Sequence, residues 1–124
     1  MNLFEMIKEF HIKFGLEYNG KPRTLPRDLR YFRLDFMEEE LNEYAHASAN
    51  GHMHNELDAL VDLVYVALGT AYLHGFDFNE GFRRVHEANM KKVRAVEVRE
   101  SKRRSVYDVI KPEGWIAPDL SDLV

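Results

Sequence analysis

Apolar residues recur at helical spacing along most of the chain and predict an all-α protein. Over residues 2–14 they stand at i, i+4, i+7 and i+11, on one face of a helix that Gly15 ends. A loop with an Asn-Gly turn and two prolines follows. A second helix is predicted from about Pro26, with Thr24 as its cap, to Ala49 before the next Asn-Gly pair. At 1.5 Å per residue it would be roughly 36 Å long, so we expect its ends to contact a partner subunit.

A third helix is predicted from about Met53 to His74, with Gly75 closing it. Its second half is apolar nearly all round, which is typical of a helix buried on most sides, in a larger core or an intersubunit bundle. Asp58 and Asp62 argue against a membrane span. The expected apolar side of the second helix comprises Leu29, Phe32, Phe36, Met37, Leu41, Tyr44 and Ala45. The expected core stripe of the third helix comprises Leu57, Leu60, Val61, Val64, Leu68 and Ala71.

The segment Asp77–Glu80 has the spacing of a capping box and predicts the start of a fourth helix. The apolar stripe of this helix includes Asn89, and an amide there is, taken alone, typical of a core side chain with satisfied hydrogen bonds. From Arg94 onward, basic residues, prolines and a glycine favour an extended arm over another helix. We therefore predict a single domain, with a bundle of four main helices over residues 1–93 and a C-terminal arm over residues 94–124. The residues expected to anchor the arm are Tyr107, Ile110, Trp115 and Leu120.

The composition is that of one soluble globular domain, with 124 residues of which 45% are apolar and 31% are charged. The absence of cysteine excludes disulfides, thiolate metal sites and cysteine nucleophiles. A net charge of −4 argues against general nucleic-acid binding. The N-terminus lacks the apolar core of a signal peptide. We therefore expect a cytoplasmic protein with neither nucleic acid nor membrane as a partner.

One acidic stretch, from Asp35 to Asp62, contains eight Asp or Glu residues and no Lys or Arg. The gap without cations extends from Leu34 to Phe82, although both flanking segments are rich in Lys and Arg. Like charges at i,i+4 on a helix cost about 0.2–0.5 kcal/mol each. A concentrated block of carboxylates without counter-ions therefore indicates bound divalent cations, with a solvated acidic helix face as the alternative.

Helical spacing sorts the acidic residues into two pairs. Glu40 and Glu43 are i,i+3 on the second helix, and Asp58 and Asp62 are i,i+4 on the third. The short connection between these helices makes them antiparallel neighbours, so the two pairs are able to face each other. Four oxygen donors without a soft ligand favour Mg²⁺ or Mn²⁺ over zinc or copper, and such ions usually act on phosphates. The cations expected to hold a polyphosphate are Lys21, Arg23 and Arg33, or Arg84, Lys91, Lys92 and Arg94.

Other chemistries have less support. A di-iron bundle requires two Glu-x-x-His motifs on different helices, and Glu43 with His46 supplies only one. His52 and His54 look like a metal clip, but residues two apart share a face only in a strand, and a helix is predicted here. The chain has neither the Gly-rich loop of P-loop enzymes nor the Gly-x-Ser-x-Gly elbow of hydrolases.

Several segments form a recognisable set: EEELNEY, ELDALVDLVYVALGTA, VHEANMKKVRA, and the shorter KFG, KPR and SKR-S-YDV-KP-GW. With them the chain resembles the all-α nucleoside triphosphate pyrophosphohydrolases, a superfamily that includes MazG, the dimeric dUTPases and phosphoribosyl-ATP pyrophosphohydrolase. It is most similar to the small phage and bacterial MazG-like branch. The resemblance implies a MazG-like helical bundle. It also implies Mg²⁺-dependent hydrolysis of the α–β phosphoanhydride of a (d)NTP or related nucleotide, giving a monophosphate and pyrophosphate.

The resemblance also assigns a metal-binding role to four acidic residues. A Glu-x-x-Glu motif of the family matches Glu40 and Glu43. A Glu-x-x-Asp motif matches Asp62, but Ala59 stands where the family has Glu. We expect Asp58, one residue earlier on the same helical face, to substitute for that Glu. The number of bound ions depends on this substitution.

Catalytic, substrate-binding and subunit contacts follow from the same resemblance. Glu39 is expected to be the catalytic carboxylate that orients the attacking water. Asn89 and Lys92 match an Asn and a basic residue that would contact the nucleotide or its phosphates. Because the family active sites commonly lie at subunit contacts, we expect a homodimer or homotetramer. The charge pattern adds Lys21, Arg23 and Arg33 to Asn89 and Lys92 as expected substrate-binding residues. Tyr65 completes the set as a candidate to stack on a base, with Phe14, Tyr18 and Trp115 as the alternatives.

The alternative to an enzyme is a catalytically silent helical protein that binds a nucleotide or a partner through the same bundle. The alanine at position 59 is the main argument for it. No motif in the sequence identifies a base or a sugar.

Overall fold

The computed structural model describes all 124 residues, which form two compact units. The first comprises Met1–Phe78 with Val124, and the second comprises Asn79–Leu123. Four helices account for most of the chain, and the only sheet has two short strands. The prediction of an all-α fold with four helices is therefore confirmed.

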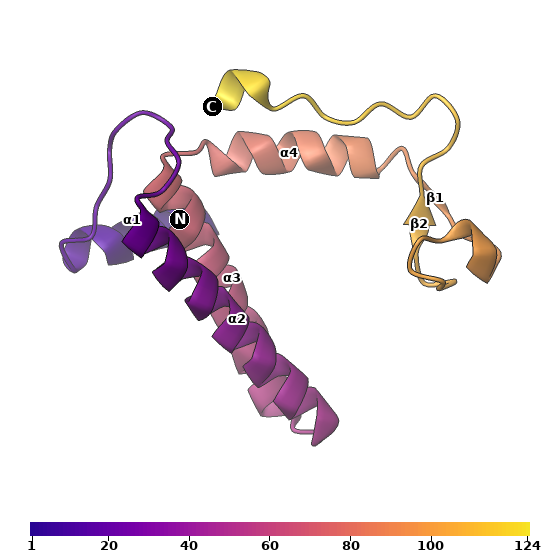
Figure 1. The fold of residues 1–124 in the computed structure, drawn as a ribbon, viewed down its shortest axis with the longest axis horizontal. Helices are drawn as coiled ribbons and strands as arrows, with labels where there is room; N and C mark the ends of the chain where they lie inside the picture. The colour runs from indigo at the N-terminus through magenta and orange to yellow at the C-terminus, as the bar shows by residue number, and fades with distance from the viewer. The chain divides into compact units, whose positions relative to one another are not determined.

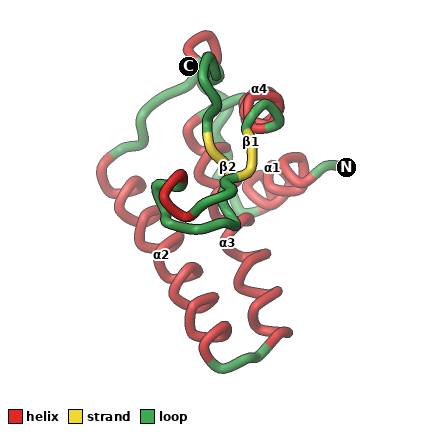
Figure 2. The backbone as a smooth tube through the Cα atoms, turned by 90° about the vertical axis from the view of Figure 1, so that its right-hand side faces the viewer, coloured by secondary structure: helices red, strands yellow, loops and turns green.

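The first unit contains α1 (Leu3–Lys13), α2 (Arg27–Ala49) and α3 (Met53–His74). A short connection joins α2 to α3, and the two helices run antiparallel and side by side (Figure 2). Gly75 ends α3 in the left-handed conformation, with φ of 78°, as a C-terminal glycine does. The start of α2 differs from the prediction, because Pro26 occupies the N-cap position and no side chain, including that of Thr24, caps the helix.

The core of the first unit lies between α1 and the C-terminal half of α3. The ring of Phe4 on α1 packs edge-on against Tyr72 of α3, and the Tyr72 hydroxyl accepts a hydrogen bond of 3.0 Å from the Tyr18 amide. Tyr72 therefore ties the loop after α1 to the core. The buried members of this core are Phe4, Ile7, Leu25, Leu68, Ala71, Tyr72 and Leu73.

The predicted stripe of α3 is only half buried. Leu68 and Ala71 belong to the core, whereas Leu57 and Val61 are 66% and 53% exposed. The reason is that α1 packs over the C-terminal half of α3 and leaves the N-terminal half uncovered. The second half of α3 was expected to be buried in a larger core or in an intersubunit bundle, and it is buried in the core of the first unit.

The face of α2 that packs against α3 is also different from the predicted one. Its buried residues are Arg33, Glu40 and Ala47, spaced seven apart, while Phe32 and Leu41 of the expected apolar side are exposed. Arg33 and Glu40 therefore occupy the interface between the long helices. The spacing of the acidic residues predicts Glu40 at this interface, whereas no sequence pattern predicts Arg33.

By length and composition α3 is long and apolar enough to cross a membrane. It packs against both α1 and α2 and carries Asp58 and Asp62 on its N-terminal half. The C-terminal half of α3 thus belongs to the core of the first unit.

The second unit contains most of α4 (Phe78–Asn89), followed by β1 (Val93–Arg94), the short helix η1 (Val98–Glu100), β2 (Val109–Ile110) and η2 (Ser121–Leu123). Here β1 pairs antiparallel with β2, with Val93 opposite Ile110. The sequence pattern does not reveal this ladder, because a two-residue strand is too short to show alternation.

After β2 the chain runs back along α4, as the yellow segment of Figure 1 shows. Trp115 is an anchor of this arm, as predicted, because its indole Nε1 donates a hydrogen bond of 2.7 Å to the Ala88 carbonyl oxygen. A second attachment joins Arg84 to Asp122. Tyr107 is 91% exposed, so its predicted role as an anchor is wrong. Asn89 is exposed at the end of α4, so the expectation of a core amide is wrong too.

Candidate active site

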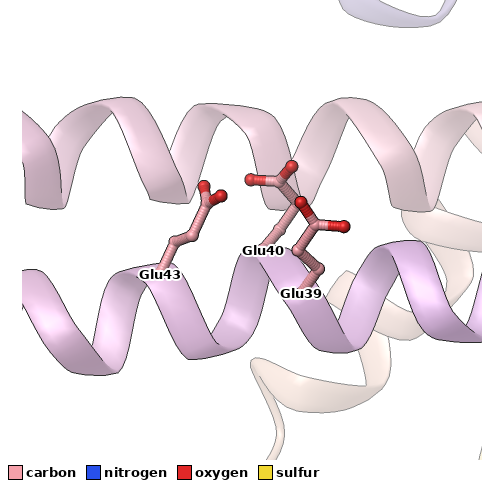
Figure 3. Close-up of side chains that lie close together, drawn as sticks. All are labelled: Glu39, Glu40 and Glu43. Atoms are coloured by element: carbon pink, nitrogen blue, oxygen red, sulfur yellow. The ribbon is translucent and has the colours of Figure 1, made fainter.

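Three glutamates of α2 converge on one point. Glu39, Glu40 and Glu43 each offer a carboxylate oxygen, and these oxygens lie within 4.8 Å of one another. Figure 3 shows the three side chains projecting from α2 towards the neighbouring helix. The i, i+1 and i+4 spacing produces this convergence, because residues four apart are stacked on one side of a helix.

The central carboxylate of this group, Glu40, is only 7% exposed, and its Oε2 atom has no hydrogen-bond partner. The pKa of Glu40 is raised to about 7, mainly by burial, and also by the hydrogen bond and charge of Glu43 and by the charges of Asp62 and Glu39. A buried carboxylate without a partner is costly in a folded protein. A cation at this point would satisfy the free oxygen and remove the repulsion.

The α3 side of the site contributes two aspartates. Burial raises the pKa of Asp62, as do the charges of Asp58 and Glu43. The charge of Asp62 on α3 also raises the pKa of Glu40 on α2. The structure thus brings the five carboxylates singled out in the sequence close enough to influence one another, from two antiparallel helices.

A pocket of about 780 Å³ opens between α2 and α3 beside the carboxylates. Ala47 and Ala59 are both buried and form its apolar part, so a small side chain stands at position 59, where the resemblance implies a further Glu. No Lys or Arg lines the pocket. The lining residues are Asp35, Glu38, Glu39, Asn42, Glu43, His46, Ala47, His52, Asn55, Asp58 and Ala59.

Several lining residues are absent from the predicted site. Asp35, Glu38 and Asn42 line the pocket together with His46. They are spaced three or four residues apart on α2 and therefore lie on one face of the helix. This spacing is visible in the sequence and is the signal by which these residues could have been predicted. His52 also lines the pocket, from the connection that precedes α3. The position of that connection is decided by the packing of the two helices.

The basic residues expected to hold phosphate from the first unit are engaged elsewhere. Arg33 is buried and donates hydrogen bonds of 2.9 Å to the Val66 carbonyl and 3.1 Å to the Thr70 hydroxyl. Arg23 donates to the Leu73 carbonyl and lies over the Tyr18 ring. Neither lines the acidic pocket.

Four further predicted contacts also lie outside this pocket. Lys21 does not line it, and its backbone oxygen accepts a hydrogen bond from Tyr18. Tyr65 lines a separate apolar groove on α3 and packs edge-on against Phe10. Asn89 and Lys92 belong to the end of α4 in the second unit.

The donor set fits a hard divalent cation. All of the converging ligands are carboxylate oxygens, and the orphaned Oε2 of Glu40 lies among them. Mg²⁺ and Mn²⁺ prefer such oxygen ligands, whereas zinc and copper favour thiolates and imidazoles. The cluster is thus a candidate metal centre beside a pocket large enough for a small-molecule ligand.

A helical fold with paired acidic residues on two antiparallel helices defines a class of all-α pyrophosphohydrolase-like proteins. The family model for phosphoribosyl-ATP pyrophosphohydrolase matches residues 7–89, and the chain belongs to this family. A search of curated proteins gave no match. The family is one of pyrophosphohydrolases, which hydrolyse phosphoanhydride bonds of nucleotide-like substrates. The resemblance drawn from the sequence is therefore confirmed.

Proposed function

We propose that this protein is a Mg²⁺-dependent nucleotide pyrophosphohydrolase that cleaves a (d)NTP or a related nucleotide to a monophosphate and pyrophosphate. The observation that carries the proposal is the buried, unpartnered oxygen of Glu40 among four other carboxylates with no cation nearby. Family membership supplies the reaction type. Mn²⁺ would suit the same oxygen ligands.

Glu40 and Glu43 would hold the ion from α2, with Asp62 and Asp58 facing them from α3. Mg²⁺ bound there would neutralise charge on the phosphates and lower the pKa of the attacking water. Glu39 is exposed and converges on the same point, so it is placed to orient that water and accept its proton. The water oxygen then bonds to the α-phosphorus, the bond between that phosphorus and the bridging oxygen breaks, and pyrophosphate leaves.

Phosphate binding requires cations that the acidic pocket itself does not provide. We keep Asn89 and Lys92 of the second unit as the proposed nucleotide contacts. Lys21 remains a candidate, whereas the engaged guanidinium groups of Arg23 and Arg33 favour a structural role. The base and sugar are left to experiment. The proposed location is the cytoplasm.

Incubation with a panel of NTPs and dNTPs and Mg²⁺, with pyrophosphate and orthophosphate measured separately, tests the function.

Glu43→Gln should lower turnover by at least about a hundredfold, because it removes a metal ligand while keeping the side-chain shape. The matched control is Glu56→Gln, which changes an acidic residue of α3 outside the pocket lining and should retain activity. A change at Asn55 would not serve, because Asn55 lines the pocket and Asn55→Asp would add a charge there. Absence of turnover with every nucleotide would contradict the proposal. Calorimetric binding of a nucleotide without hydrolysis would favour the catalytically silent alternative, for which the alanine at position 59 is the argument.

A further inference from the structure

Two lysines, Lys92 and Lys111, lie beside the ring of Trp115, the single tryptophan of the chain, near the end of α4 in the second unit. The Lys92 Nζ lies 5.2 Å from the Trp115 ring centroid, and the Lys111 Nζ lies 5.1 Å from it. Lys92 follows α4, whereas Lys111 belongs to the arm after β2. The hydrogen bond from Trp115 to Ala88 fixes the ring against α4. The arm therefore brings a second ammonium group to the same indole.

These two lysines differ from five of the arginines of the same unit, whose side chains have hydrogen-bond or ion-pair partners. No ion pair of the structure includes Lys92 or Lys111, and Arg94 donates to the Val106 carbonyl. Two like charges brought to one ring repel each other, so an anion between or beside them would be stabilised. The ion pairs of the unit join Arg83 to Glu80 and Glu87, Arg84 to Glu80 and Asp122, Arg99 to Glu97, and Arg103 to Asp108.

Capping of α4 does not account for the two ammonium groups. Cations are favourable near a helix C-terminus, but the last carbonyls of α4 already have N–H donors. The Ala88 oxygen accepts from Trp115 Nε1 and from the Lys91 amide, and the Asn89 oxygen accepts from the Lys92 amide. Both ammonium groups are thus free to bind a ligand.

We propose that Lys92 and Lys111 together form a phosphate-binding site, with Trp115 as its rigid support and the arm as the element that delivers Lys111. The ligand class is a polyphosphate anion, either free pyrophosphate or the phosphate chain of a nucleotide. A lysine ammonium binds phosphate as a compact point charge with three donors. The choice of anion rests on the proposed function, whereas the site rests on the geometry around Trp115.

Titration of the full chain with sodium pyrophosphate in EDTA tests the site. Because Trp115 is the only tryptophan, its fluorescence reports binding, and calorimetry gives the Kd independently. EDTA prevents a metal ion from bridging the anion to the acidic pocket. We expect Kd to rise about tenfold in Lys92→Gln and in Lys111→Gln, since each loses a charge-assisted contact. Lys111→Arg keeps the charge and should restore most of the affinity.

Lys102→Gln is the matched control, because it removes a lysine of the same unit that does not contact the ring, and it should bind like the wild type. Equal loss of affinity in Lys92→Gln, Lys111→Gln and Lys102→Gln would overturn the proposal, since binding would then follow overall charge. So would unchanged affinity in all three. A far-UV circular dichroism spectrum and a Tm equal to those of the wild type verify that each free variant remains folded.

Two comparisons separate this proposal from the proposed function. A non-hydrolysable nucleoside triphosphate that binds more tightly than pyrophosphate, with the same dependence on both lysines, would assign the site to the nucleotide phosphate chain. Equal affinities would assign it to the phosphates alone. Glu43→Gln should lose hydrolysis and keep pyrophosphate binding in EDTA. Lysine-dependent binding by a wild-type protein that hydrolyses no nucleotide would contradict the proposed function and leave the phosphate site standing.

Discussion

At the scale of single residues, the burial of Glu40 is the feature with the largest consequence. Its neighbours on α2 and α3 are carboxylates, and its Oε2 atom has no partner. A helix face that only served solubility would keep such a group in water, where it costs little. A fold that buries it accepts a loss of stability at that position, which is a pattern typical of functional sites.

The raised pKa of Glu40 predicts how stability depends on pH without metal. The folded-state pKa of about 7 lies above the ordinary value of 4.5, so the folded protein holds a proton that the unfolded chain releases. Stability is therefore fully present below about pH 4.5 and is lost as the pH rises through 7. In EDTA at pH 8, Glu40→Gln should be more stable than the wild type by roughly 1–2 kcal/mol. This range is smaller than the full free energy of the pKa shift, because the adjacent pocket is open to solvent, which screens the charges.

Thermal unfolding followed by circular dichroism at pH 5 and pH 8 measures this difference, which should be several times smaller at pH 5. Glu56→Gln, outside the pocket, serves as the control and should follow the wild type. Excess Mg²⁺ at pH 8 should raise the Tm of the wild type more than that of Glu40→Gln. The same pH dependence in both proteins would show that burial of Glu40 has no energetic consequence.

At the scale of elements, Gly69 sets how closely three helices meet. A Cβ atom at this position of α3 would lie 2.6 Å from Nη2 of Arg33 on α2 and 3.0 Å from Nε2 of His11 on α1. Both neighbours are buried, and Arg33 is held by its hydrogen bonds to α3. Burial lowers the pKa of His11, and the charge of Arg33 lowers it too, so both favour the neutral imidazole. Gly69 therefore makes room for a polar packing arrangement that a larger residue would displace.

Gly69→Ala should destabilise the protein by roughly 1–3 kcal/mol, because the methyl group forces Arg33 away from its acceptors. Gly81→Ala on α4 is the matched control, since its Cβ would have no neighbour closer than Leu123 Cδ1 at 3.9 Å. That change should stabilise by about 0.5–1 kcal/mol through helix propensity. Urea unfolding of both variants gives the two values, and a neutral Gly69→Ala would refute the packing argument.

At the scale of the whole molecule, the exposed apolar stripe of α3 is the outstanding feature. Leu60, Val61 and Val64 line a groove of about 320 Å³ with Leu3 and Met6 of α1. The stripe continues the line of Leu68 and Ala71, which are buried in the core. A continuous helical stripe that is covered over one half and bare over the other fits a second copy packed along it, as in a helical bundle. We therefore keep a homodimer or homotetramer as a prediction.

Leu57→Glu on this stripe should shift the protein towards monomer, because it places a charge in the expected interface. Light scattering coupled to size-exclusion chromatography measures the change. Ile12→Glu makes the same substitution at a helix position that is 57% exposed and outside the groove, so it is the control. A monomeric wild-type protein at high concentration would rule out the oligomer.

Much of the fold followed from the sequence because its helices are long and their ends carry strong local signals. The stop at Gly75 and the antiparallel α2–α3 pair depend on backbone preferences that act within a few residues. The acidic pairs followed for the same reason, since i,i+3 and i,i+4 spacing fixes a side of a helix. The spacing of apolar residues predicted the wrong buried face of α2. It identifies the most apolar face of a helix, whereas the face that packs against α3 contains Arg33 and Glu40.

The sequence alone determined the helical class, the family and the five carboxylates, since each depends on residue type and local spacing. Only the tertiary structure decided which carboxylate is buried, which cations are already engaged, and that Lys111 meets Lys92 at Trp115. These facts depend on contacts between segments far apart in the chain. Such contacts are selected by packing, hydrogen bonding and desolvation together, and no local pattern records their outcome.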